Sequence, residues 1–257
     1  MNVLLTSAGR RSYLVKYFKE VLEVFGEVHA SNTEWSTALE IADVGVISPL
    51  IYDDRYIDFL IEYAKKQVTQ ICNDKWKTYY FLKENGLHAP KSFINLEKAQ
   101  EAIITGSIQC PLMIKPRWGM GSISIFKADN GQELEMLYNK VKRDVHESYL
   151  KYESKLDPEH SVIIQEYLDG KEYGLDIINN LNKEYVTTLV KKKTAMRSGE
   201  TDGAITVKNE MLEETGMKIA QHLGHIANLD TDCFIVNGKP YILEMNCRFG
   251  GGYPFSH

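Results

Sequence analysis

The sequence lacks the features that mark several large protein classes. Its four cysteines show neither CxxC pairing nor zinc-ligand spacing, which argues against a disulfide scaffold and a structural zinc module. No stretch approaches the roughly eighteen apolar residues of a membrane span, and the N-terminal VLL is far too short for a signal peptide. We therefore expect a soluble, cytoplasmic protein that has no membrane partner.

An excess of basic residues is also absent. The chain carries 35 acidic and 30 basic residues, a net charge of -5, so no global positive field favours nucleic acid as a partner. Its 44% of hydrophobic and 25% of charged residues are ordinary for a folded globular protein. An anionic ligand would therefore have to be held by a local group of side chains.

The first 70 residues have the pattern of a parallel α/β sheet. A strand, a turn and an amphipathic helix are predicted in NVLLTSAGRRSYLVKYFKEVLEVFG, further strands in VHASN and VGVISPL, and a second helix in YIDFLIEYAKK. The turn lacks the GxGxxG spacing of dinucleotide-dependent dehydrogenases, which argues against that class. Arg10 and Arg11 could bind a carboxylate at the helix start, although surface charge is the commoner reading.

A second region begins with a helix predicted in NDKWKTYYFLKENG. Asn73 or Asp74 suits its N-cap, and Gly86 suits its end. A helix over 97–104, a strand in PLMIKPR, a glycine-containing turn in WGMGS, a strand in SISIFKA and a long helix over about 132–152 follow. This order predicts a compact α+β unit.

The third region, after Pro158, is predicted to be mostly antiparallel sheet. Four strand candidates are SVIIQEYL, KEYGLDIIN, KEYVTTLVKKK and DCFIVN, with a helix over about 209–227 before the last. KPYILEMN closes the series.

That closing strand ends in polar side chains at every second position. Glu244, Asn246 and Arg248 should share one face, since successive strand residues point to opposite sides, and Leu243 and Met245 take the other. Oxygen-bearing side chains beside a guanidinium suit Mg²⁺ that is itself bound to phosphate. The alternative is a solvated strand end without function.

The preceding strand offers Asp232 as a further oxygen donor. A two-residue loop at Asn237-Gly238 would put Asp232 on the wrong face, whereas a three-residue loop with a bulge would place it opposite Glu244. We expect the second geometry.

Two more segments have spacing that suits a nucleotide. Lys115 ends an apolar strand just before Gly119 and Gly121, and glycines let backbone N–H groups approach a phosphate beside a lysine charge. No Walker A sequence is present, so a plain hairpin turn remains the alternative. In SVIIQEYLDGKEYGLDI, the extended backbone over 166–168 could form hydrogen bonds with an adenine edge, and Glu172 could bind a sugar hydroxyl. The alternative is that this segment is an ordinary hairpin.

In this order, the motifs resemble the ATP-grasp superfamily, especially its carbamoyl phosphate synthase and biotin carboxylase branch, over residues from about 73 to 252. The most specific part is an acid, Asp232, twelve positions before Glu244 of an EMNxR strand. The resemblance implies an α/β plus α+β chain in which two α+β subdomains, 73–160 and 161–257, clasp ATP. A short Rossmann-like domain, 1–72, precedes them.

The resemblance also implies residue roles. Asp232, Glu244 and Asn246 would hold one or two Mg²⁺ ions, with Mn²⁺ as an alternative, while Arg248 and Lys115 would act on the transferred phosphoryl group. Residues 118–122 would form a lid, and TAMRSGETDGAIT a loop on the substrate side. The implied nucleotide-binding residues are Lys75, Lys115, Gly119, Gly121, Ser122, Gln165, Glu166, Tyr167, Leu168, Glu172 and Met196.

The activity implied by the resemblance is that of an ATP-dependent ligase acting through an acyl phosphate on a small carboxylate or bicarbonate and an amine or thiol. The implied products include ADP and phosphate, and the resemblance allows a homodimer. A non-catalytic ATP-binding module is the alternative, but such a module should lack one of the metal ligands. The N-terminal domain looks about forty residues short of a complete one, so we expect segments near residue 67 and after residue 257 to be missing.

Overall fold

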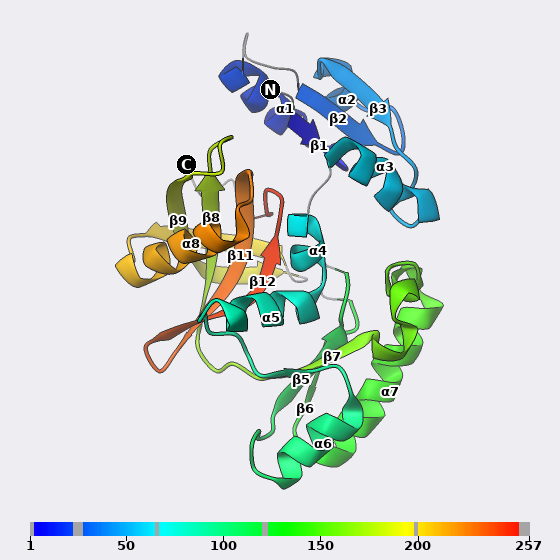
Figure 1. Cartoon of the computed structure of the whole chain (residues 1–257), viewed down its shortest axis with the longest axis vertical. Coiled ribbons are helices and arrows are strands. Elements are labelled where there is room, and N and C mark those ends of the chain that lie inside the picture. The colour runs from blue at the N-terminus through cyan, green and yellow to red at the C-terminus, as the bar shows by residue number, and fades with distance from the viewer. Residues whose placement is uncertain (1–2, 23–27, 65–66, 120–122, 198–199, 252–257) are drawn as a thin grey trace. The chain divides into compact units, whose positions relative to one another are not determined.

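The computed structural model describes residues 3–22, 28–64, 67–119, 123–197 and 200–251 (Figure 1). The chain divides into two compact units, Met1–Lys65 and Lys66–His257. Each unit is considered by itself below.

The first unit is built on a parallel sheet in the order β1-β2-β3. Val15, Val28, Ala30 and Leu39 are fully or almost fully buried in its core. The strand–turn–helix opening is therefore confirmed, whereas α2 was not predicted. The elements are β1 (Val3–Leu5), α1 (Ser12–Leu22), β2 (Val28–Asn32), α2 (Thr37–Ile41), β3 (Val44–Ile47) and α3 (Asp54–Ala64).

The second unit contains an antiparallel four-stranded sheet in the order β4-β7-β5-β6. Asn95 and Asn130 cap its two helices, each accepting backbone N–H bonds of the first turn. Its elements are β4 (Ser92–Phe93), α6 (Leu96–Ile104), β5 (Leu112–Pro116), β6 (Phe126–Ala128), α7 (Gly131–Glu147), the 3-10 turns η1 (Tyr149–Lys151), η2 (Glu153–Leu156) and η3 (Pro158–His160), and β7 (Val162–Glu166). The strand expected from residue 122 is thus shorter, and the helix expected to reach residue 152 ends at Glu147, where 3-10 turns take over.

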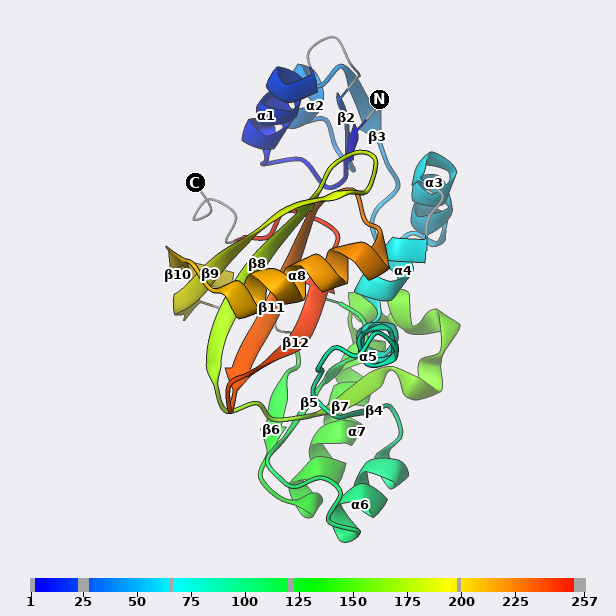
Figure 2. The ribbon, with the colours of Figure 1, turned by 60° about the vertical axis from the view of Figure 1, so that its left-hand side comes forward.

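An antiparallel five-stranded sheet, in the order β10-β9-β8-β11-β12, forms the rest of this unit. Helix α8 lies across one of its faces (Figure 2). The elements are α4 (Gln67–Asn73), α5 (Lys75–Glu84), β8 (Lys171–Asn179), β9 (Tyr185–Arg197), β10 (Glu200–Val207), α8 (Glu210–Leu223), β11 (Ala227–Val236) and β12 (Lys239–Asn246).

The sheets correct two expectations about the third region. Strand β7 pairs with β4 and β5, so it belongs to the four-stranded sheet and not to the sheet that follows it in sequence. Strand β10, paired with an extended β9, stands where TAMRSGETDGAIT was expected to form a loop. The domain boundaries after residues 72 and 160 stay predictions.

The β11–β12 hairpin places Asp232 opposite Glu244, as expected, but by a different route. Val236 pairs with Lys239, so the turn at Asn237 and Gly238 has two residues, both with positive φ, as type I′ turns require. The register then shifts between Cys233 and Asp232. The expected three-residue loop is therefore wrong: a two-residue turn and a bulge within the strands produce the pairing.

Candidate active site

The two faces of the five-stranded sheet differ sharply in chemistry. One face packs against α8 and α5 and is buried, with Leu175, Ile177, Val190, Ile242 and Met245 in its core. The alternate residues make up the other face, which we call the polar face. It includes Glu172, Gly174, Asp176, Lys191, Lys193, Asp230, Asp232, Glu244 and Asn246.

Asp232 and Glu244 are direct cross-strand neighbours on the polar face. The Asp232 carboxylate accepts a hydrogen bond of 2.6 Å from Lys193 Nζ, which also donates to Glu172 Oε1 at 2.7 Å. Burial raises the pKa of Asp232, although the Lys193 charge opposes that shift. Asp232 therefore faces charged partners and not the hydrophobic interior.

Lys75 and Lys115 bring positive charge to the same carboxylates. Lys75 opens α5, and its Nζ lies 3.8 Å from Glu244 Oε1. Lys115, only 5% exposed at the end of β5, has its pKa lowered to about 8 by burial and by the charge of Lys75, against the pull of Glu244 and Asp232. The structure thus gathers the lysine and carboxylate predictions in one place.

The glycine turn after β5 is in contact with Lys75. Lys75 Nζ donates to the Gly119 carbonyl at 2.7 Å. Gly119 has a φ of +97°, which strains any side chain, and a Cβ there would come within 2.4 Å of Leu150 Cδ2 in η1 and would displace that leucine. Gly121 and Ser122, predicted as further lid residues, lie outside the described residues.

The predicted adenine-reading segment divides into two parts. Gln165 and Glu166 belong to β7: Gln165 is buried and donates from Nε2 to Ser92 Oγ, while the Glu166 backbone N–H donates to the Lys91 carbonyl. Tyr167, which is 40% exposed, and Leu168 lie in the connection that leads to β8. The role of these residues toward a nucleotide stays a prediction.

Two predicted residues lie near strand ends. Arg248 follows β12, and its backbone N–H donates to the Asn246 carbonyl at 2.7 Å while its own carbonyl accepts from Asn228 Nδ2. Met196 lies on β9 near the strand's end and is 43% exposed. The Arg197 side chain lies outside the described part.

Sequence reasoning missed several charged residues of this region. Lys193 joins Glu172 to Asp232, and Lys191 forms a buried ion pair of 2.5 Å with Asp176. The alternation in KKK of β9 could have suggested that two lysines share one face. Arg117, which binds Asp74 before α5, had no local sequence signal.

Asp230, two residues before Asp232 in β11, belongs to the same set of charges. Burial, together with the nearby carboxylates of Asp232 and Asp176, raises the pKa of Asp230 to about 7. It pairs across the strands with Asn246. The carboxylates on this face are therefore held at a cost in hydration that the lysines offset in part.

Other kinds of site find little support among the described residues. No three His, Cys, Asp or Glu side chains in that part of the chain come together as a metal site. The Asp232–Glu244 pair is thus two carboxylates with a neighbouring amide, a donor set that suits a cation sharing ligands with phosphate. Of the helices in the described ranges, none has the length and apolar character that crossing a membrane requires.

Comparisons with known proteins agree with this geometry. A family model described as an ATP-grasp domain matches residues 72–252, and one described as a PylC-like N-terminal domain matches residues 3–75. The arginine-specific large chain of carbamoyl phosphate synthase from Bacillus subtilis is 23% identical over 190 residues, which are 71% of this chain and 17% of the relative. The chain therefore spans a small part of the curated relatives it matches.

Solved structures show the same fold at low sequence identity. The biotin carboxylase domain dimer of the Hydrogenobacter thermophilus 2-oxoglutarate carboxylase, solved with MgADP, ADP and bicarbonate, has a TM-score of 0.70 at 13% identity. The match covers 98% of this chain and 65% of that one. The L-amino acid ligase of Bacillus licheniformis has a TM-score of 0.69 at 17% identity, over 99% of this chain and 70% of the other.

The predicted resemblance, with its fold, is thereby confirmed. The matched family model covers well over half of the chain, and the two antiparallel sheets bring together the lysines and carboxylates from which the resemblance was argued. The chain belongs to the ATP-grasp domain family, with a PylC-like domain at its N-terminal side.

Proposed function

We propose that the chain is a ligase that uses Mg-ATP to convert a small carboxylate into an acyl phosphate, which an amine or thiol then captures. The observation that carries the proposal is the cross-strand pair of Asp232 and Glu244 on the polar face, with Lys75, Lys115 and Lys193 beside it. Hard carboxylate oxygens and lysine ammonium groups are the two partners that Mg²⁺ and a triphosphate need.

The charges of the site form a set that can change partners. Lys193 binds Asp232, and Lys75 lies near Glu244. A nucleotide triphosphate offers the lysines new anionic partners, and its cation offers the carboxylates a new positive one. Binding would therefore exchange ion pairs without leaving a buried charge unmatched, which limits the desolvation cost.

Each residue has a proposed task. Asp232, Glu244 and Asn246 would hold the cation, Lys75 and Lys115 would bind phosphate oxygens, and Glu172 would bind the ribose. Tyr167 and Leu168 would flank the adenine. A bound Mg²⁺ would neutralise charge on the terminal phosphates.

The remaining groups would serve the transfer itself. A carboxylate oxygen of the substrate attacks the γ-phosphorus and ADP leaves; the nucleophile then attacks the acyl carbon and phosphate leaves. Arg248 would hold the carboxylate and the acyl phosphate by two parallel hydrogen bonds. The Gly119 turn would keep water from the intermediate. We propose that the chain forms a homodimer, because the biotin carboxylase neighbour is a dimer.

A coupled screen tests the proposal. Carboxylic acids, including bicarbonate, are combined with amines and thiols, and ATP-dependent phosphate release is measured with hydroxylamine present to trap an acyl phosphate as a hydroxamate. We expect release that depends on one acid, hydroxamate formation from it, and loss of both in Glu244→Gln. ATP hydrolysis that no acid stimulates, without hydroxamate, would contradict a ligase, and Mg-ATP binding without turnover would indicate a non-catalytic module.

A further inference from the structure

Arg117 is a buried arginine whose hydrogen bonds join three separate segments. Its Nε and Nη2 donate to the two carboxylate oxygens of Asp74 at 2.8 and 2.7 Å, and its Nη1 donates to Asp157 Oδ2 at 2.9 Å. The guanidinium also lies 4.2 Å from the centre of the Trp118 ring. It thus ties the start of α5 to the 3-10 segment and to the residue before Gly119.

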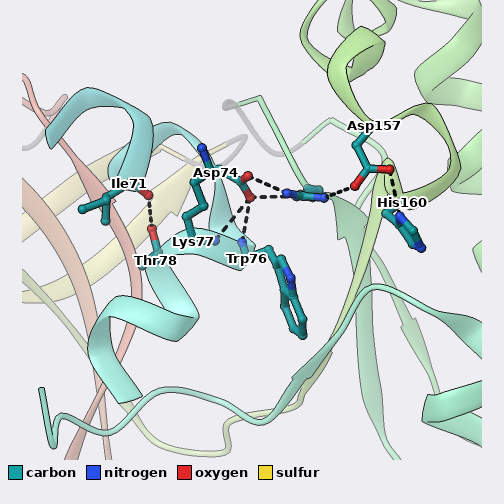
Figure 3. Close-up of polar contacts among 8 residues, drawn as sticks. Ile71, Asp74, Trp76, Lys77, Thr78, Asp157 and His160 are labelled. Atoms are coloured by element: carbon teal, nitrogen blue, oxygen red, sulfur yellow. Dashed lines mark hydrogen bonds and ion pairs between the residues drawn. The ribbon is translucent and has the colours of Figure 1, made fainter. Parts of the chain in front are cut away.

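Asp74 is placed so that its position sets that of Lys75. It is the N-cap of α5, and its Oδ1 accepts from the backbone N–H groups of Trp76 and Lys77, as Figure 3 shows. A cap side chain in this geometry fixes the direction in which the first helical turn starts. Lys75 is the first residue of that turn.

The backbone of Arg117 reinforces the same arrangement. Its carbonyl accepts from the Lys75 backbone N–H at 3.3 Å, and its own N–H donates to the Ser161 carbonyl at 2.9 Å. Lys75 Nζ in turn donates to the Gly119 carbonyl. Lys75 is therefore held to residues 117–119 at its backbone and at its side-chain end, and Arg117 supplies the backbone contact.

The environment of Arg117 favours a geometric role. Two carboxylates already match its charge, which leaves it poorly suited to clamp a phosphate itself. Buried ion pairs contribute little net stability, because desolvation offsets their attraction, and their best attested use is to fix one arrangement. The two-point fork between guanidinium and carboxylate is also a contact that a lysine cannot reproduce.

We propose that Arg117 is a positioning residue for the nucleotide site: through Asp74 and its own carbonyl it aims Lys75 at the phosphates and sets Lys75 against the Gly119 turn. The inference rests on the proposed function, because Lys75 has a task only if a nucleoside triphosphate binds there. Arg117 itself touches neither substrate nor nucleotide in this account.

Titration calorimetry of Mg-ATP binding to the full chain tests the inference without knowledge of the carboxylate substrate. We expect Arg117→Lys to weaken binding at least about tenfold, since the charge stays but the fork is lost. Asp74→Asn should cause a similar loss, because asparagine caps a helix equally well but carries no charge for the guanidinium. The two variants change the two partners of the same ion pair, so either one can test the inference if the other folds poorly.

A double-mutant cycle separates positioning from direct contact. If Arg117 acts through Lys75, adding Arg117→Lys to Lys75→Ala should change affinity by no more than about twofold. Independent, multiplying losses would show that Arg117 acts on the nucleotide without Lys75 and would overturn the inference.

Two controls address mere destabilisation. Arg55 makes a similar fork with Asp53, but exposed and in the other unit, so Arg55→Lys should leave Mg-ATP affinity unchanged. Leu82→Ala, on the core side of α5, should lower the melting temperature and leave affinity within about twofold. An Arg117→Lys chain that melts earlier but binds like the parent overturns the inference alone, whereas a parent that binds no Mg-ATP overturns the proposed function as well.

Discussion

The two faces of the five-stranded sheet are made by alternate residues of the same strands, yet they do opposite things for stability. Along β8, Tyr173, Leu175 and Ile177 enter the core under α8, while Glu172 and Asp176 enter the polar face. A fully buried aliphatic side chain contributes about 1.5–3 kcal/mol. The polar face instead keeps partly dehydrated charges, and the pKa of Lys115 beside it is lowered to about 8 by burial.

The apolar face therefore stabilises the folded chain, whereas the dehydrated charges of the polar face destabilise it in the absence of a ligand. Charges held close together before a ligand arrives are unfavourable in the free protein and favourable once partners of opposite sign bind. Substitutions on the two faces should therefore separate effects on stability from effects on nucleotide binding.

Glu244→Gln should reduce ATP-dependent phosphate release by about 100- to 1,000-fold, because it weakens the hold on a metal ion that supplies several kcal/mol of charge stabilisation in the transition state. Its free energy of unfolding should stay within about 1 kcal/mol of the parent value, since the side chain is partly exposed. Steady-state kinetics and urea unfolding measure the two effects. Glu214→Gln, on the exposed side of α8, is the matched control and should change neither; full activity in Glu244→Gln would remove the metal assignment.

Leu175→Ala leaves a cavity in the apolar face and should lower the free energy of unfolding by about 3 kcal/mol, as is usual for a buried leucine whose surroundings cannot collapse. Mg-ATP affinity of the folded chain should change by less than about threefold. Urea unfolding and calorimetry below the transition check this. If the fully folded variant lost much of its Mg-ATP affinity, the apolar face would contribute to nucleotide binding as well as to stability, which contradicts this account.

Lys115→Met should stabilise the free chain by about 3 kcal/mol at pH 7 while weakening Mg-ATP binding at least about tenfold. Burial lowers the pKa of Lys115 from 10.5 to about 8, and each unit corresponds to about 1.4 kcal/mol. Below pH 8 the lysine is charged in both states and the penalty is complete; it shrinks between pH 8 and 10.5, where the folded lysine is already neutral.

The stability advantage of Lys115→Met should accordingly vanish as the pH rises from about 8 to about 10.5. Unfolding curves of the parent and the variant at about pH 7 and about pH 10 measure it. A variant that is less stable than the parent at neutral pH would show that the neighbours of the lysine overcome its burial.

Gly238→Ala should have the smallest effect, about 1 kcal/mol of lost stability. Gly238 has a φ of +74° and open space around it, so the cost is conformational alone. Gly131 also has open space but no positive φ, and Gly131→Ala at the start of α7 should not destabilise. Thermal unfolding compares them, and equal effects at both positions would contradict the type I′ turn. Mg-ATP affinity should be unchanged, because the bulge between Asp232 and Cys233 also fixes the register of β11 and β12 and so keeps Asp232 opposite Glu244.

Much of this arrangement could be predicted because strand periodicity is local. The alternation of Glu244 and Asn246 with apolar residues, and the lysine at the end of β5, are visible in a few consecutive residues. The pairing of Asp232 with Glu244 was also predicted, but through the wrong loop. Asn237-Gly238 is a dipeptide that favours a two-residue type I′ turn, whereas the bulge between Asp232 and Cys233 that restores the pairing has no signal in the hairpin sequence.

The failures concern contacts between distant segments. Arg117 meets Asp74 and Asp157 across 43 and 40 residues, and such a partnership leaves no periodic trace. The membership of β7 in the four-stranded sheet depends on pairing with β5 and β4, which neighbouring sequence does not encode. The stretch TAMRSGETDGAIT was expected to form a loop because of the family resemblance, and its pairing in β9 and β10 overturns that expectation.

A crystal structure of the chain with Mn²⁺ and a non-hydrolysable ATP analogue, with the metal located by its anomalous signal, tests the central claim most directly. The account predicts a metal about 2.2 Å from carboxylate oxygens of both Asp232 and Glu244 and from a phosphate oxygen, with Lys193 released from Asp232. A metal bound by phosphates and water alone, while Lys193 still holds Asp232, would contradict it.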